Sequence, residues 1–261
     1  MPDPYLLLLL GLAALLTGFV DAIVGGGGLI QLPALLLGLP GQPLATVLGT
    51  SKTAGVAGTL VALRRYLRDP ATRQAVRWRT VSAVAGAAGG GAWLGARSVS
   101  ALPKEAVRPL VLGLLVVMGA YTLWRKDFGQ QARPRSFRPG RELAAAGALG
   151  LVLGFYDGFF GPGMGSLLLF AFVGGFGYDF LAASASAKLV NVVTNVVALT
   201  YFVLHGNVLY AVSLPMAVCN MAGSWLGTRV ALRRGTGFVR GLFLVVLGAF
   251  ILKLGWEVAR G

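Results

Sequence analysis

The chain has little charge for its length and few of the residues that build metal centres or disulfides. Charged residues make up 12% of its 261 residues, about half of the ~25% found in soluble domains. One cysteine and one histidine argue against a disulfide framework and a metal site. Hydrophobic residues, in contrast, make up 56%, and mean hydropathy is +0.75. Apolar runs approach the ~20 residues that cross a bilayer as a helix. The composition predicts an all-α, polytopic integral membrane protein without a cofactor.

Positive charge is the exception to this scarcity, because the formal net charge is +14. In a soluble protein such an excess would suggest nucleic acid as a partner. Here lysine and arginine lie in short clusters between apolar runs, as in cytoplasmic loops of membrane proteins. We therefore expect the lipid bilayer, and no nucleic acid, around this chain. The first apolar run, 5–20, lacks the basic start and cleavage motif of a signal peptide and is expected to be retained.

The sequence repeats itself. Four landmarks recur in order, at an offset of 136 residues up to the first basic loop and 132 after it: Asp21 and Asp157, the glycine runs at 25–28 and 161–165, Lys52 and Lys188, and Trp93 and Trp225. Such self-similarity predicts two homologous halves. They are residues 1–126 and 142–261, joined by a polar cytoplasmic linker at 127–141, in one membrane domain.

Each half is predicted to contain five helical segments, the first two separated by the glycine run. The segments are 5–24, 29–38, 43–63, 80–97 and 106–124, and then 142–160, 165–176, 180–204, 208–228 and 238–257. Glycines at four-residue spacing predict close helix packing at Gly86, Gly90, Gly91, Gly95, Gly223 and Gly227. Aromatic residues at span ends predict interface anchors at Tyr66, Trp78, Trp124, Tyr210 and Trp256.

The distribution of basic residues decides between two topologies, since lysine and arginine accumulate on the cytoplasmic side. If each broken helix folds back as a hairpin, 16 basic residues lie inside and 3 outside. If each crosses once, the numbers are 12 and 7. The hairpin topology is favoured, and it gives each half an odd number of elements. The second half would then be inverted relative to the first, with both termini outside, as in many secondary transporters.

Two aspartates and two lysines are predicted to lie inside the membrane, again as repeat pairs: Asp21 with Asp157, and Lys52 with Lys188. An ionisable group in hydrocarbon costs about 2.5–3.5 kcal/mol on insertion scales, so it needs a partner or a task. One interpretation makes them buried Asp–Lys bridges that hold the hairpins to neighbouring spans. The other makes the lysines substrate ligands and the aspartates carriers of a coupled proton.

Polar neighbours and helix ends favour a binding site around the lysines. Ser184, Lys188, Asn191 and Asn195 fall on one helical stripe. Helices that restart after the glycine runs would present free N–H groups and a positive dipole end to an anion. The expected ligand is a small anion, with a neutral or zwitterionic solute as the alternative. The remaining candidate binding residues are Thr50, Ser51, Gly26, Gly27, Gly28, Gly163 and Gly165.

Three segments resemble the TauE/SafE sulfite exporter family. They begin with Asp21-Ala-Ile-Val and its glycine run, continue with Gly49-Thr-Ser-Lys, and end with Tyr156-Asp-Gly-Phe-Phe-Gly-Pro-Gly-Met-Gly-Ser. The resemblance covers essentially the whole chain. It implies a bacterial inner-membrane carrier of sulfite and small organosulfonates such as sulfoacetate. The second glycine run departs from the first at Pro162 and Met164, so the two hairpins need not bind alike.

The residues and the resemblance together predict an inverted-repeat secondary transporter of small anions that works by alternating access. Transport of another carboxylate or zwitterion, and an anion channel, remain alternatives. An enzyme is not expected, because two interior aspartates, one histidine and one cysteine offer little for catalysis. The exact substrate, the direction of transport, the coupling ion and assembly into a homo-oligomer stay open.

Overall fold

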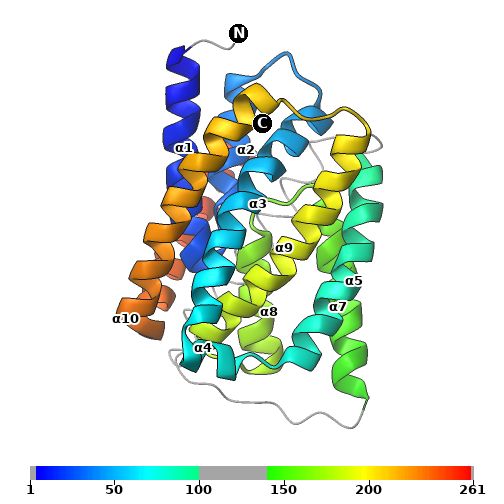
Figure 1. Ribbon diagram of the computed structural model, residues 1–261, viewed down its shortest axis with the longest axis vertical. Coiled ribbons are helices and arrows are strands. Elements are labelled where there is room, and N and C mark those ends of the chain that lie inside the picture. Colours follow the sequence, from blue (N-terminus) through cyan, green and yellow to red (C-terminus); the bar gives the residue numbers. More distant parts are fainter. Residues whose placement is uncertain (1–3, 100–139, 260–261) are drawn as a thin grey trace.

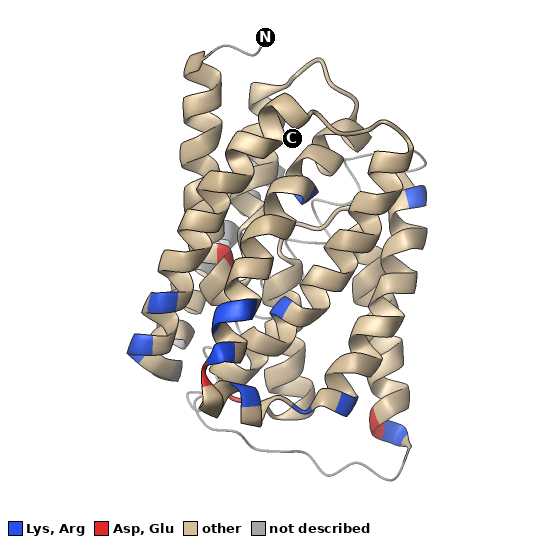
Figure 2. Cartoon of the chain, in the orientation of Figure 1, with Lys and Arg blue, Asp and Glu red and all other residues tan. Residues whose placement is uncertain are grey.

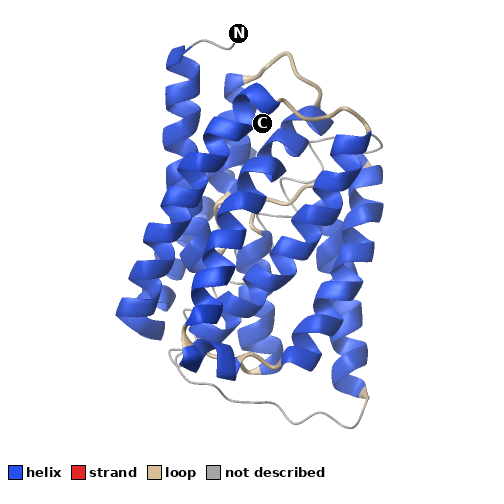
Figure 3. Ribbon diagram, in the orientation of Figure 1, coloured by secondary structure: helices blue, strands red, loops and turns tan. Residues whose placement is uncertain are grey.

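The computed structural model describes residues 4–99 and 140–259, and within these ranges the chain is helical with no strand (Figure 1, Figure 3). The segment expected at 106–124 lies outside the described residues. The helices are α1 Pro4–Val24, α2 Gly28–Gly38, α3 Leu44–Arg68, α4 Pro70–Ala75, α5 Trp78–Arg97, α7 Arg141–Phe159, α8 Met164–Phe176, α9 Phe180–Leu204 and α10 Tyr210–Ala259. Three of them, α1, α7 and α9, are long and apolar enough to cross a membrane. The prediction of an all-α membrane protein is confirmed.

The chain folds back on itself at the first glycine run. Gly25 has a φ of +77°, a left-handed conformation that glycine adopts without the penalty of a Cβ atom. α2 then returns along α1, because its last residue, Gly38, lies against Leu6 and Leu10 near the start of α1. α1 and α2 therefore form a hairpin rather than one crossing.

The second glycine run makes the same turn, with Gly161 at a φ of +90°. Arg77 joins the two ends of this hairpin. Its Nη1 lies 3.3 Å from Oε1 of Glu142 at the start of α7, and its Nη2 donates to the carbonyl of Phe176 at the end of α8 over 2.6 Å. The α7–α8 hairpin opens toward the end where Arg77 lies, and the α1–α2 hairpin opens toward the opposite end (Figure 1).

The closest helix packing joins elements that are far apart in the sequence. α5 packs along α7, and α1 packs along α10, at positions where a glycine lets backbones touch. A Cβ atom on Gly154 would lie 2.1 Å from the carbonyl oxygen of Ala88, and one on Gly18 would lie 2.1 Å from that of Asn220. These are the same contact in the two halves, since Gly18 matches Gly154 and Ala88 matches Asn220 at the sequence offsets. The closest packing among the described helices is therefore between the halves.

Several local predictions are corrected by the structure. Tyr66 is an interior residue, because its ring is fully buried and its hydroxyl donates to the carbonyl of Ala22 over 3.0 Å. Gly86 and Gly90 face open space, whereas Gly91, Gly95, Gly223 and Gly227 make the expected close contacts.

The last two expected segments form one helix, α10, which is interrupted by non-helical Gly235 at a φ of +75°. Trp78 and Tyr210 are exposed at helix starts, as expected, and Trp124 lies outside the described residues.

Basic side chains gather at the end of the bundle where α3, α4 and α5 meet (Figure 2). This end carries Arg64, Arg65, Arg68, Arg73, Arg77 and Arg79. The opposite end carries the turn from His205 to Asn207, which has no lysine or arginine. The described chain thus has one strongly basic end and one nearly uncharged end.

Candidate functional site

The two glycine breaks touch one another backbone to backbone. The N–H of Ser166, in α8, donates to the carbonyl of Gly25 over 3.2 Å. A Cβ atom on Gly25 would lie only 2.2 Å from the carbonyl carbon of Gly165. Because no side chain fits there, glycine at these positions permits the contact. The breaks of the two halves therefore meet inside the bundle.

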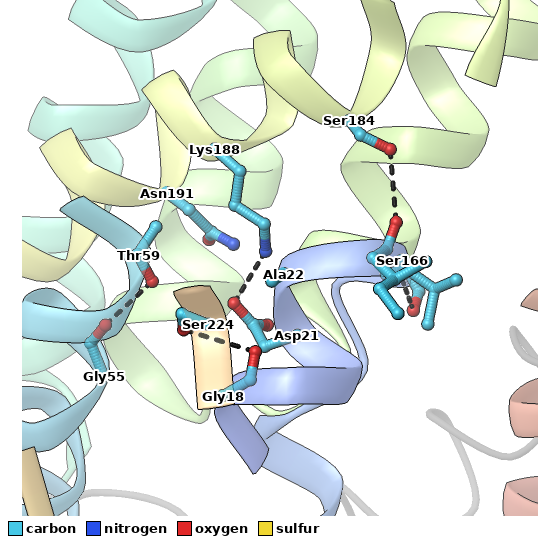
Figure 4. A network of polar contacts seen from close by, with 12 residues as sticks. Gly18, Asp21, Ala22, Gly55, Thr59, Ser166, Ser184, Lys188, Asn191 and Ser224 are labelled. Atoms are coloured by element: carbon cyan, nitrogen blue, oxygen red, sulfur yellow. Dashed lines mark hydrogen bonds and ion pairs between the residues drawn. The ribbon is translucent and has the colours of Figure 1, made fainter. Parts of the chain in front are cut away.

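The first break is closed by side-chain hydroxyls. The last carbonyls of a helix have no partner within the helix, and at the end of α1 three hydroxyl groups from other helices donate to them. Tyr66 donates to Ala22 over 3.0 Å. Ser184 donates to Ile23 over 3.2 Å and Ser166 to Val24 over 2.9 Å, and both serines are seen in Figure 4. The break between α1 and α2 is thereby fixed by α3, α8 and α9.

Each interior lysine pairs with an aspartate of the other half. Nζ of Lys188 donates to Oδ2 of Asp21 over 2.6 Å, from α9 to α1 (Figure 4). Nζ of Lys52, in α3, lies 3.3 Å from Oδ1 of Asp157 in α7. It also donates to Oδ1 of Asn195 over 3.1 Å. Both lysines are buried, so each charge is compensated within the protein rather than by water.

A cavity of about 70 Å³ lies beside the second break. Its wall includes the turn 160–165, together with polar side chains from α1, α2, α3, α7, α9 and α10. These side chains are Thr17, Asp21, Gln31, Ser51, Lys52, Thr59, Asp157, Asn191, Asn195 and Asn220. The volume admits a few water molecules and is far below the ~300–1,000 Å³ of pockets for drug-sized ligands. The cavity is suited to a small polar solute or ion.

Within the described part of the chain, three buried oxygen atoms on this wall have no hydrogen-bond partner: Oδ2 of Asp157, Oδ1 of Asn191 and Oγ1 of Thr17. Buried polar atoms are normally paired, since leaving one unpaired costs about 1–3 kcal/mol. Together on one cavity wall, these atoms leave hydrogen-bonding capacity unused beside the cavity.

A chain of side-chain amides runs along part of the cavity wall. Nε2 of Gln31 donates to the carbonyl of Ser51 over 2.7 Å, which leaves Oε1 of Gln31 to accept from Nδ2 of Asn220 over 3.0 Å. Because the Ser51 carbonyl can only accept, the orientation of both amides is fixed. Ser51 precedes Lys52, so these amide hydrogen bonds hold this turn of α3 against α2 and α10.

The structure brings most of the expected site residues to the cavity, and leaves others outside it. Those on the wall are Lys52, Ser51, Asn191, Asn195, Gly28, Gly163, Gly165, Asp21 and Asp157. Those not on the wall are Lys188, Thr50, Ser184, Gly26 and Gly27. Ser184 closes the first break, and the hydroxyl of Thr50 bonds to backbone groups of Thr46 and Leu209. Their hydroxyls serve the fold rather than the cavity.

Sequence reasoning missed Gln31, Asn220, Thr17 and Thr59, which also line the cavity. Gln31 and Asn220 are buried polar residues within apolar segments, and that is the signal by which they could have been found. Thr59 could have been found from the repeat, because it occupies the position that matches Asn195. Thr17 carries no such signal.

The fold and the cavity define a class: a helical membrane protein whose two broken helices meet beside a small polar cavity. Residues 10–254 match the family model of the sulfite exporter TauE/SafE. The chain is 33% identical over 257 residues to the probable membrane transporter protein YfcA of Escherichia coli K12, covering 98% of this chain and 92% of that protein. It is 34% identical over 251 residues to the probable membrane transporter protein ORF9 of a Sinorhizobium species, covering 96% and 92%. The chain belongs to the TauE/SafE family. No solved structure matches it.

Proposed function

We propose that the protein is a secondary transporter that carries a small anion, sulfite or an organosulfonate, across the bacterial inner membrane. The observation that carries the proposal is the small cavity where the two breaks meet, with Lys52 as the only cation on its wall among the described residues. A buried ammonium group attracts an anion strongly because little water screens it. Membership of a family named for sulfite export supports the same conclusion.

Alternating access is the mechanism that this architecture supports. The two hairpins open toward opposite ends of the bundle, and their breaks meet beside the cavity (Figure 1). In transporters built from inverted repeats, such a site is exposed to one side and then the other as one part moves against the rest. The small volume of the cavity, about 70 Å³, supports a carrier over a continuously open channel.

Ligand-dependent stabilisation of the purified protein tests this proposal. Melting temperature would be measured with sulfite, sulfate, methanesulfonate, sulfoacetate, acetate and taurine, because stabilisation follows RT ln(1 + [L]/Kd). We expect the sulfur oxyanions to stabilise the protein and the Lys52→Met variant to lose the effect. Thr200→Val, an exposed change on α9, is the control that should retain it. Stabilisation by acetate or taurine alone would show that the substrate is a carboxylate or a zwitterion instead. If none of the six compounds stabilises the protein, the proposal is refuted.

A further inference from the structure

The two lysine–aspartate pairs occupy matching positions in the repeat but are not equivalent. The Lys188–Asp21 pair has a short 2.6 Å contact, typical of a strong charge-assisted hydrogen bond. The Lys52–Asp157 pair is longer, at 3.3 Å, and engages only Oδ1 of the carboxylate. Oδ2 of Asp157 has no partner, although the residue is only 2% exposed. The carboxylate of Asp21 is therefore held tightly, whereas only one of the two carboxylate oxygens of Asp157 is paired.

The surroundings of the two pairs also differ, because polar side chains that lie beside one pair are replaced by apolar ones at the matching positions of the repeat. Beside Lys52, polar side chains form the amide chain from Gln31 to Ser51 and Asn220. At the sequence offsets, the residues that match these three are Leu167, Ala187 and Ala88, all buried and apolar. The amide chain beside Lys52 therefore has no counterpart at the matching positions of the repeat.

The two glycine breaks show the same asymmetry. The hydroxyls that close the first break come from Tyr66, Ser184 and Ser166. The residues that match them around the second break are Phe202, Leu48 and Ile30, which have no hydroxyl group. The second break has one such hydroxyl, that of Tyr156, which donates to the carbonyl of Pro162. Residues 160–165 of the second break line the cavity, whereas the first break contributes Gly25 and Gly28. The first break is thus tied to more helices, and the second forms more of the cavity wall.

Resting on the proposed function, we infer that Asp157 and Lys52 together couple a proton to a monovalent anion. A proton from solvent binds Oδ2 of Asp157, the atom without a partner. The neutral carboxyl no longer compensates Lys52, whose ammonium group then binds the anion in the cavity. Asp21 and Lys188 hold α1 to α9 and do not take part in this exchange.

Charge balance explains why the proton and the anion would move together. The empty site contains one ammonium and one carboxylate and is neutral. With both a proton and a monovalent anion bound, it is neutral again. With only one of them bound, it carries a net charge inside the membrane, which is strongly unfavourable. Only the neutral states can therefore switch the cavity from one side of the membrane to the other. A divalent anion would need a second proton to give a neutral state.

Among the residues that the structure describes, few other charged groups face Asp157. Lys52 faces it from α3, and Asp21 of α1 lies on the same cavity wall, itself paired with Lys188 of α9. On its own helix, the hydroxyl of Tyr156 donates to the carbonyl of Pro162. Described residues of α8 include no ionisable side chain, and those of α5 are at its ends. A proton-dependent change in anion binding therefore points to this pair.

Binding of methanesulfonate and sulfate to the purified full-length protein tests the inference. The two probes are nearly the same size and differ in charge, and neither changes its charge between mildly acidic and mildly alkaline pH. We expect the affinity for methanesulfonate to rise by up to about tenfold per unit of falling pH, as uptake of one proton requires. Sulfate should bind at least about tenfold more weakly.

The two matching aspartates supply the paired variants. Asp157→Asn should bind methanesulfonate with an affinity that no longer depends on pH. The double variant Asp21→Asn, Lys188→Met, which removes both charges of the other pair, should keep the pH dependence of the wild type. Loss of the dependence in this double variant, or its survival in Asp157→Asn, would overturn the inference. If the wild type binds methanesulfonate with an affinity that does not depend on pH, the inference is also overturned, but the proposed function stays intact. Failure of the wild type to bind any sulfur oxyanion would instead refute the proposed function.

A spectroscopic measurement covers the case in which Asp157→Asn does not fold. Infrared difference spectra of the wild type, recorded on addition of methanesulfonate, should show the carbonyl band of a newly protonated carboxyl group. Asp157→Glu should shift this band in frequency, and Asp21→Glu should leave it in place. Absence of the band in a wild type that binds methanesulfonate contradicts the inference.

Discussion

At the scale of single residues, the four interior charges show how one sequence pattern leads to two different environments. All four look alike in the sequence, since each is an ionisable residue in an apolar span. The structure separates them by their contacts: Lys188 has its one short bond to Asp21 and no place on the cavity wall. Lys52 shares its ammonium between Asp157 and Asn195 and does line the cavity. Both pairs are therefore the buried bridges of one interpretation, and the substrate and proton roles of the other stay predictions.

If the Lys188–Asp21 pair is structural, removing one member should destabilise the protein. Lys188→Met leaves the carboxylate of Asp21 without its cation, and breaking a buried pair in this way costs about 3–5 kcal/mol. The double variant Asp21→Asn, Lys188→Met removes both charges and should recover most of that loss. Free energies of unfolding from denaturant titration in detergent would measure both effects. A single variant as stable as the wild type would show that the pair does not hold α1 to α9.

The residues that sequence reasoning could place are those that break a local rule. Asp21, Asp157, Lys52 and Lys188 are charges in apolar spans, and the repeat doubles their signal. The partner of each lysine could not be predicted, because the pairs join different halves and depend on how the halves pack. Gln31 is similar, since its contacts with Ser51 and Asn220 bring together three helices that are distant in the chain.

At the scale of helices, the pattern of glycines determines how closely the two halves approach. The four-residue spacing predicted close contacts but could not say which glycines make them. Along α7, Gly154 packs against the backbone of Ala88, whereas Gly147 has nothing within 4 Å of a Cβ position. The helix bounds were easier to predict: the expected segment 180–204 coincides with α9. Capping explains this success, because Asp179 accepts a hydrogen bond from the N–H of Ala182 at the start of α9.

The two glycines of α7 provide a matched test of the packing between halves. Gly154→Ala would place a Cβ atom 2.1 Å from a backbone oxygen of α5, so the helices must separate and the protein should lose several kcal/mol of stability or fail to fold. Gly147→Ala adds the same methyl group in open space and should be neutral or stabilising by up to about 1 kcal/mol. Melting temperatures of the two purified variants give the comparison. Equal stability of both would contradict the close packing of α5 on α7.

At the scale of the whole molecule, the halves are interleaved rather than adjacent. α1 packs on α10 and α5 on α7, so each hairpin is held by the other half. Both ion pairs and the contact between the breaks also join the two halves. A movement that exposes the cavity to one side must therefore change contacts between halves, and the second break is the part with fewer fixed contacts.

The orientation of the molecule in the membrane can be tested with cysteine labelling, because Cys219 is the only native cysteine. We expect the basic end of the bundle to face the cytoplasm, since lysine and arginine accumulate there. In a Cys219→Ala background, Gln74→Cys marks this end and His205→Cys marks the other, and both positions are exposed. A membrane-impermeant maleimide should label His205→Cys in intact cells and Gln74→Cys only after the cells are permeabilised. The reverse pattern would turn the molecule over, and the α1–α2 hairpin would then open to the cytoplasm.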